Sequence, residues 1–330
     1  MWLDGQAVRP PDVLPAPFVT AETDPNQTLR VHFARRLTMR TLQINHRTRY
    51  AYDRPVAFGV HHLMIRPRDG HDMRILDSSL VVTPRADVHW AYDTFGNSVA
   101  LLTFHEEADE LVIASKLELR RYGLDEPVPR IERHAGDYPF RYDPDDSIDL
   151  ALLLSVHCPQ DRPAVERWIS AMMPELPNRS LQVLDLLGTA IHESFTYRRR
   201  EANGVQSPAE TITTASGTCR DFAFLFMEAA RSLGFAARFV TGYLYDPDSD
   251  TANKGALSGG GSTHAWADVF IPGAGWIEFD PTNRIVAGRN LVRVATTRTP
   301  AQAVPVSGTY RHDGAVSLGM NVEVSVTRLG

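Results

Sequence analysis

Of the two cysteines in the 330-residue chain, Cys219 stands at the start of a segment with helical spacing. Thr218 and Asp221 form a T-x-x-D pattern around it, which is typical of a capping box at a helix start. Free backbone N–H groups and the positive end of the helix dipole favour an anion there, so we expect the thiolate form of Cys219 to be stabilised. The alternative is a small buried side chain, because Cys219 lies three residues before Phe222 on the apolar stripe.

A nucleophilic thiol needs a base, and His264 is the candidate among the twelve histidines. It follows the glycine-rich run GGGST, which lets a substrate or another backbone come close, and it opens the predicted strand HAWADVFI. The next predicted strand, WIEFD, ends in Asp280 and is stopped by Pro281. The other histidines have simpler interpretations; His192, for example, lies beside Glu193, where a surface position is expected.

The register between these two strands decides whether His264 and Asp280 can meet. The strands are joined around PGAG and should form an antiparallel hairpin. A four-residue loop would pair residue 271 with 276 and place the two side chains on opposite faces. A five-residue loop or one bulge would pair 270 with 276, making His264 and Asp280 diagonal neighbours roughly 7–8 Å apart between backbones. We predict the second register; otherwise Asp280 only ends its strand as an Asp-Pro turn.

Two long segments resemble the bacterial transglutaminase-like superfamily, which has a Cys–His–Asp order on a papain-like core: SGTCRDFAFLFMEAARSLGFAARFVTGY and THAWADVFIPGAGWIEFDPTN. RYAYDRPVAFGVHHLMIRPR and WAYDTFGNSVALLTF resemble the β-rich N-terminal region that accompanies this core. The resemblance covers about residues 40–285 and, more weakly, the tail. It implies that Cys219 is the nucleophile, His264 the base and Asp280 the orienting acid.

The implied reaction is acyl transfer on a peptide or carboxamide substrate through a thioester with Cys219. The backbone N–H of Cys219 would be one oxyanion donor. Resolution of the thioester by water makes a cysteine peptidase or amidase, and we expect this outcome. Resolution by an amine makes a protein-glutamine gamma-glutamyltransferase, and a catalytically inactive binding module is the alternative outside catalysis.

Several other residues have ordinary structural interpretations. Asp268 is expected to be a solvated edge residue, and Cys158 a surface or packing cysteine. Tyr197 could donate to an oxyanion, although a core aromatic is the simpler interpretation. Three further aromatic residues could line a cleft but fit core packing equally well: Tyr243, Trp266 and Trp276.

No metal or cofactor is expected. Cys219, His264 and Asp280 lack paired ligand spacings such as C-x-x-C or H-x-x-x-H. The sequence has no nucleophile-elbow motif G-x-S-x-G. It also has no phosphate-binding motif, because GGGS at 259–262 precedes a predicted strand rather than a helix.

The composition excludes several function classes. The net charge of −6 and the absence of a basic stripe argue against a nucleic-acid partner. No apolar run approaches the roughly 18 residues that a membrane span needs, and the N-terminus lacks a signal-peptide pattern. Two cysteines cannot form a disulfide framework. We therefore expect a cytoplasmic protein. The resemblance implies a peptide or protein substrate, and we assign no oligomeric state.

The elements that must position these residues predict an α+β fold. Residues 1–38 are proline-rich without strand or helix periodicity, so we expect a disordered leader or a start upstream of the natural Met39. Residues 39–122 show short β-rich runs typical of a β-sandwich. Residues 123–146 are expected to be a linker. Residues 147–330 carry helical segments followed by strands, including a C-terminal strand, and the resemblance implies that they form the papain-like, transglutaminase-like catalytic core.

Three helices are expected in that core, from the segments RPAVERWISAMMP, LQVLDLLGTAIHESFTY and CRDFAFLFMEAARSL. Gly234 should end the helix that begins near Cys219, because glycine readily adopts the left-handed conformation that terminates helices.

Overall fold

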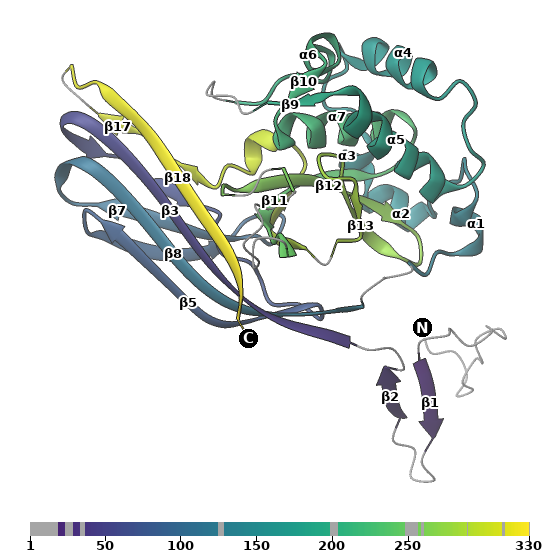
Figure 1. Ribbon diagram of the computed structural model, residues 1–330, viewed down its shortest axis with the longest axis horizontal. Coiled ribbons are helices and arrows are strands. Elements are labelled where there is room, and N and C mark those ends of the chain that lie inside the picture. The colour runs from purple at the N-terminus through teal and green to yellow at the C-terminus, as the bar shows by residue number, and fades with distance from the viewer. Residues whose placement is uncertain are drawn as a thin grey trace.

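The computed structural model describes residues 19–23, 29–33, 37–124, 129–198, 204–247, 257–258, 261–288, 290–311 and 314–329. Long curved strands form one part of the molecule, and helices packed on a shorter sheet form the other (Figure 1). Helices and antiparallel sheets are thus largely segregated along the chain, and the expected α+β class is confirmed.

The first part is a β-sandwich. In one sheet the strand order is β17 (Tyr310–Arg311), β3 (Leu37–Phe58), β8 (Glu107–Leu124) and β5 (Met73–Thr83), with β18 (Ser317–Leu329) also paired to β3. In the other sheet the order is β16 (Val306–Ser307), β4 (His61–Leu63), β7 (Ser98–Phe104) and β6 (Ala86–Tyr92). Apolar side chains of both sheets, such as Val56, Leu102 and Ile113, pack in a common buried cluster.

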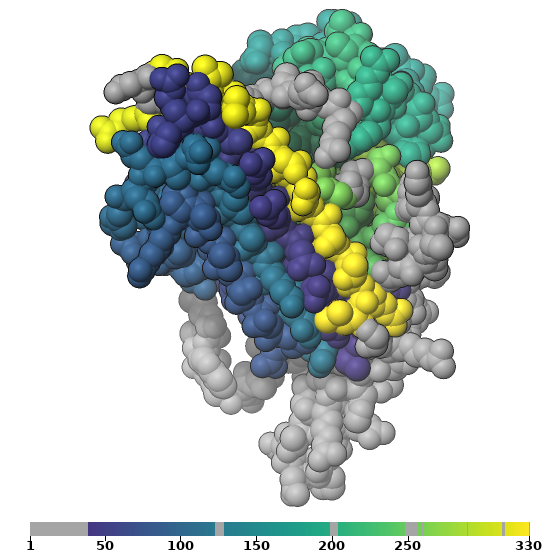
Figure 2. Space-filling model, turned by 60° about the vertical axis from the view of Figure 1, so that its left-hand side comes forward, coloured from purple at the N-terminus to yellow at the C-terminus, as the bar shows by residue number. Residues whose placement is uncertain are grey.

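The C-terminal strand does not belong to the catalytic core, which corrects the expected boundary at residue 330. β18 pairs with β3 from Ser317 opposite Tyr52 to Leu329 opposite Thr41, and the two strands run side by side in Figures 1 and 2. Without β18, one edge of the 22-residue strand β3 would present unpaired backbone groups along much of its length. The tail therefore returns to the sandwich and covers that edge.

The second part is built on a sheet with the order β14 (Ile285–Val286), β13 (Gly275–Asp280), β12 (His264–Ile271), β11 (Ala237–Leu244) and β15 (Leu291–Thr297). The helix α7 (Cys219–Ser232) packs against β11 and β12. Its Phe226 ring stacks on Phe279 of β13 with the ring centroids 5.3 Å apart. Almost the whole helix is buried, as expected for a helix enclosed by other elements.

This part contains further helices. Three of them pack against α7: α4 (Arg162–Met172), α5 (Ser180–Ser194) and α6 (Pro208–Thr214). The others are α1 (Arg133–Gly136), α2 (Pro144–Asp149), α3 (Ala151–Leu154) and the 3-10 helix η2 (Pro300–Gln302). A short parallel pair joins β9 (Thr196–Tyr197) to β10 (Ser216–Gly217) just before α7. The three predicted helices correspond to α4, α5 and α7. Gly234 has φ +87° and follows the C-cap residue Leu233 of α7, so its predicted role at the helix end is confirmed.

The expected linker is in large part fastened to the core, and this prediction is therefore corrected. β8 extends to Leu124, and residues 129–146 include α1 and the first turn of α2. The Tyr142 hydroxyl donates to the Phe270 carbonyl (2.8 Å) and accepts from the Ala236 N–H (2.9 Å). Aromatic side chains give this segment the apolar surface that holds it in place; Tyr138, for example, stacks on the buried Phe235.

Part of the expected disordered leader forms strands. β1 (Val19–Thr23) and β2 (Leu29–Phe33) pair in an antiparallel hairpin, so the expectation of no strand is wrong for these segments. The second segment, LRVHF, alternates apolar and polar residues as strands do, a short strand signal within the otherwise proline-rich region. Apart from these strands and the start of β3, residues 1–38 lie outside the described residues.

The two parts share an apolar core. Leu42 and Leu117 of the sandwich lie in one buried cluster with Val292 and Val294 of β15. Within this interface the Tyr243 hydroxyl donates to the Ile65 carbonyl across the two parts (2.9 Å). The sandwich therefore supports one side of the sheet whose strands lead to the candidate site.

Candidate active site

The start of α7 has the predicted capping arrangement. The carboxylate of Asp221 accepts hydrogen bonds from the backbone N–H of Thr218 (2.8 Å) and from its hydroxyl (2.9 Å). The same carboxylate accepts from the N–H of Gln206 (2.7 Å), which ties the preceding segment to the helix. Cys219 is the first residue of α7 and is only 6% exposed. The helix start therefore holds a buried thiol among backbone donors.

The hairpin has the predicted register. Phe270 lies opposite Trp276, as the five-residue loop requires, and the pairing continues from there through Ala267 opposite Phe279. In this register His264 Nε2 lies 2.7 Å from Asp280 Oδ2. Both side chains are fully buried, so solvent screens their interaction only weakly.

The turn after β13 holds the Asp280 carboxylate from several sides. Oδ1 accepts from the Thr282 N–H (2.9 Å), and Oδ2 accepts from the Asn283 side-chain amide (2.9 Å). Burial acts to raise the pKa of Asp280, but the charge of His264 and these hydrogen bonds outweigh it and lower the pKa below its ordinary value. Asp280 is therefore held as an acceptor for the imidazole.

The imidazole of His264 favours its charged form. Burial acts to lower the pKa of His264, yet the carboxylate of Asp280 and the nearby Cys219 thiol together raise it to about 10. Asp280 occupies Nε2. The other ring nitrogen, Nδ1, is buried and has no hydrogen-bond partner in the described part of the chain. The ring thus has one nitrogen engaged by the acid and one left for the thiol of Cys219.

The expectation that Asp268 is a solvated edge residue is wrong. Asp268 is fully buried because β12 lies inside the sheet, between β11 and β13. Its carboxylate pairs with the Arg238 guanidinium at 2.9 Å. A buried carboxylate needs such a partner, and position within the sheet cannot be read from one strand alone.

The aromatic residues considered for the cleft mostly serve packing. Trp266 is buried with Val240 and Leu291 in a small cluster, and Tyr243 lies between the two parts of the molecule. Tyr197 packs edge-on against Phe222 at 6.4 Å between ring centroids, consistent with a core aromatic.

Two residues that the sequence analysis did not connect with the site support the turn after Asp280. His192, exposed as predicted, lies with Nδ1 2.9 Å from the Thr282 carbonyl oxygen. Asn283 bonds Asp280 and the backbone of Ser258. The DPTN string contained Asn283, but only the fold shows which groups its amide meets.

Within the described residues, no group of three His, Cys, Asp or Glu side chains is placed to hold a metal ion. In the same residues, no helix has both the length and the apolar character needed to cross a membrane. The predicted cytoplasmic location stays a prediction.

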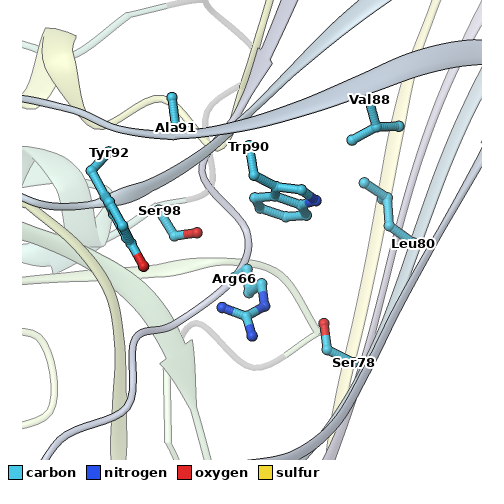
Figure 3. Close-up of a pocket in the computed structure, with 8 residues that line it drawn as sticks. All are labelled: Arg66, Ser78, Leu80, Val88, Trp90, Ala91, Tyr92 and Ser98. Atoms are coloured by element: carbon cyan, nitrogen blue, oxygen red, sulfur yellow. The ribbon is translucent and has the colours of Figure 1, made fainter.

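A separate hollow of about 550 Å³ lies in the sandwich, between β5 and β6 (Figure 3). Trp90 and Arg66 face each other within it, with the guanidinium carbon 5.9 Å from the ring centroid. Its lining is completed by Ser78, Leu80, Val88, Ala91, Tyr92 and Ser98. No cysteine, histidine or carboxylate lines this hollow.

Comparison with family models agrees with the resemblance seen in the sequence. Residues 42–120 match the bacterial transglutaminase-like N-terminal region, and residues 174–281 match the transglutaminase-like superfamily. The second match contains Cys219, His264 and Asp280.

Among known proteins, an uncharacterised protein of Mycobacterium tuberculosis is 28% identical over 277 residues, covering 81% of this chain and 86% of the relative. A Pseudomonas aeruginosa protein-glutamine gamma-glutamyltransferase is 30% identical over 109 residues, which are 32% of this chain but 16% of that protein. A solved structure of a proposed cysteine protease from Cytophaga hutchinsonii has a TM-score of 0.67 at 22% identity, covering 89% of this chain and 92% of that chain. This likeness shows a shared fold. Together with the family match, it supports a cysteine-dependent enzyme in general terms.

Proposed function

Because the chain carries a transglutaminase-like core behind a bacterial transglutaminase-like N-terminal region, we propose that it catalyses acyl transfer through Cys219 on peptide or carboxamide substrates. The observation that carries the proposal is the buried 2.7 Å contact between His264 and Asp280, which leaves Nδ1 for the thiol. A base oriented by an acid next to a thiol at a helix start is the arrangement that activates a nucleophile.

In the proposed reaction the thiolate of Cys219 attacks the substrate carbonyl carbon, and the carbonyl π electrons move to oxygen. The backbone N–H of Cys219 at the start of α7 donates to this oxyanion. When the tetrahedral intermediate collapses, the C–N bond breaks and the imidazolium of His264 gives the leaving amine its proton. The product bound to the enzyme is a thioester.

Hydrolysis completes the proposed cycle. Neutral His264 takes a proton from a water molecule as the water oxygen attacks the thioester carbon. The C–S bond breaks, and the acid product leaves with the thiolate and imidazolium restored. Asp280 remains ionised throughout, holding the imidazole orientation and stabilising its charged form.

An amine acceptor is the second candidate. The local likeness to the Pseudomonas protein-glutamine gamma-glutamyltransferase favours it, since the same thioester would then be attacked by an amine instead of water. Incubation of the protein with a glutamine-containing protein and a fluorescent primary amine distinguishes the two. Fluorescence attached to the protein substrate would support transamidation, whereas release of ammonia or of peptide fragments without attachment supports hydrolysis.

The test of the proposed site needs no substrate. We would measure the rate of iodoacetamide labelling at Cys219 between pH 5 and 10, in the wild type and in His264→Ala. Because a thiolate paired with an imidazolium reacts at acidic pH, labelling should stay fast in the wild type and fall at least about tenfold near pH 6 in the variant. Ordinary thiol behaviour in both proteins would overturn the proposal and favour the inactive binding module.

Cys158 provides an internal control. It is half-buried, and burial together with the charges of Glu228 and Asp161 raises the pKa of its thiol to about 11. It should therefore label slowly across the neutral range in both proteins. Peptide mapping of the labelled product separates the two cysteines.

A further inference from the structure

The side chain of Asn283 joins two separate pieces of the candidate site. Its amide nitrogen donates to Asp280 Oδ2 (2.9 Å) and to the Ser258 carbonyl (3.1 Å). Its amide oxygen accepts from the Ser258 N–H (2.8 Å). Asn283 therefore connects Asp280, at the end of β13, with the backbone of Ser258, which precedes His264 in the chain.

We propose that Asn283 is a positioning residue of the active site, whose amide holds the Asp280 carboxylate and the segment leading to His264 in one fixed arrangement. This inference rests on the acyl-transfer function proposed above. Asn283 would not touch the substrate; it would act through Asp280 and His264.

The first argument is the sharing of one carboxylate oxygen. Asp280 Oδ2 accepts from Asn283 and is also the partner of His264 Nε2. The amide nitrogen lies 3.5 Å from Nε2, and both nitrogens point at the same oxygen. Because an ionised carboxylate only accepts, Nε2 must carry the proton of that contact, which leaves Nδ1 as the buried ring nitrogen without a hydrogen bond in the described part of the chain.

The second argument concerns the approach to His264. Gly261, in the glycine-rich run before His264, adopts φ +80°, a conformation that glycine reaches without strain. Two of the described residues of this approach are held by contacts from elsewhere in the chain. Asn283 holds Ser258 through both of its backbone polar groups, and the N–H of Val324 in β18 donates to the Gly261 carbonyl (3.1 Å).

The third argument is chemical. The contacts use both amide hydrogens and the amide oxygen of Asn283, a set that no other side chain of this size supplies. Aspartate would keep an acceptor for Ser258 but would place a second negative charge against Asp280. Alanine would remove all of these contacts and leave the backbone of Ser258 to other partners.

The test compares Asn283→Ala and Asn283→Asp with the wild type in the pH profile of iodoacetamide labelling at Cys219. In Asn283→Ala, looser positioning of His264 and Asp280 should reduce the rate of labelling at Cys219 near pH 6 by roughly tenfold to a hundredfold. Asn283→Asp should show the same loss at neutral pH. At pH 5 and below, the labelling rate of Asn283→Asp should recover relative to that of Asn283→Ala. A proton shared between the carboxylate of Asp280 and the introduced carboxylate then restores a hydrogen-bond donor.

A matched control is Asn45→Ala, which removes an exposed amide that donates to the Ser325 hydroxyl at 3.2 Å, outside the candidate site. Its labelling profile should equal that of the wild type. Circular dichroism monitors folding of every variant, and if Asn283→Ala does not fold, the near-isosteric Asn283→Asp decides alone.

The outcomes separate this inference from the function on which it rests. If the wild type shows no fast labelling at acidic pH, the proposed function fails first. If the wild type does show it and folded Asn283 variants match Asn45→Ala, the function stands and the positioning role is overturned. A loss confined to the Asn283 variants, with recovery of Asn283→Asp at low pH, supports the role.

Discussion

Burial and pairing decide how the residues of the candidate site ionise. His264 and Asp280 are each only 1% exposed, so their mutual attraction is not diluted by water. The pKa of His264 is raised and that of Asp280 is lowered, although burial alone acts in the opposite direction on each. Each charge therefore depends on the other, and removal of either should change the ionisation of its partner.

The pair makes stability depend on pH in a defined direction. Since the pKa of His264 rises from 6.5 to about 10 on folding, its contribution to stability is complete below pH 6.5 and is lost as pH approaches 10. The lowered pKa of Asp280 gives a contribution that is lost only as pH falls through the acidic range.

Between pH 7 and pH 9.5, the free energy of unfolding of the wild type should therefore fall relative to that of Asp280→Asn. The two slopes of unfolding free energy against pH should differ by up to about 1.4 kcal/mol per pH unit, because the folded wild type binds one more proton than its unfolded state in this range. Urea unfolding at four pH values measures it. Parallel curves for the two proteins would contradict the raised pKa of His264.

At the scale of elements, α7 is fixed by an ion pair near its end as well as by its cap. Glu228 and Arg231 are buried and bond each other at 2.9 Å. Glu228 also accepts from the N–H groups of His157 (3.1 Å) and Cys158 (2.8 Å), and Arg231 donates to the Ala237 carbonyl at the start of β11 (2.8 Å). The helix that begins at the thiol is thereby tied to a loop and to the sheet.

Glu228→Gln should destabilise the fold strongly, because it leaves the buried guanidinium of Arg231 without its counter-charge. Loss of one partner of a buried pair costs about 3–5 kcal/mol. The exposed pair of Arg162 with Glu166 offers a control, and Glu166→Gln should cost no more than about 0.5 kcal/mol. Urea unfolding of both variants checks the contrast; equal losses would mean that the buried pair contributes no more than a surface pair.

At the scale of the whole molecule, the β-sandwich and the transglutaminase-like core behave in the structure as one packed unit. Their shared cluster includes Ile44 of β3 and Val292 of β15. Tyr243 crosses the interface, with its hydroxyl 2.9 Å from the Ile65 carbonyl and 3.0 Å from His46 Nδ1. Burial lowers the pKa of His46 to about 4, so this contact joins neutral groups at neutral pH.

Tyr243→Phe should therefore lower the stability of the whole molecule while keeping a single unfolding transition. The change leaves the Ile65 carbonyl and His46 Nδ1 buried without the hydroxyl, at a cost of about 1–3 kcal/mol. Tyr92→Phe, at a residue 71% exposed, is the control and should have little effect. Scanning calorimetry measures both, and two separate transitions would show that the parts unfold independently.

Features that depend on near neighbours in the chain can be predicted from the amino-acid sequence. The capping pattern around Cys219 and the glycine after α7 act within a few residues, and the pairing of β12 with β13 is a hairpin between adjacent strands. Such contacts follow from side-chain types and turn length, because little chain must be ordered to form them. The register that brings His264 to Asp280 could be predicted for this reason.

Features that join distant segments become visible only in the folded chain. The pairing of β18 with β3, the burial of Asp268 inside the sheet and the contact of Asn283 with Ser258 depend on which apolar faces of the folded chain meet. A strand pattern states which side chains share a face but not which strand will be its neighbour. Which strands pair depends on how much apolar surface is buried and how many backbone groups are hydrogen-bonded over the whole chain. A short stretch of sequence does not contain this information.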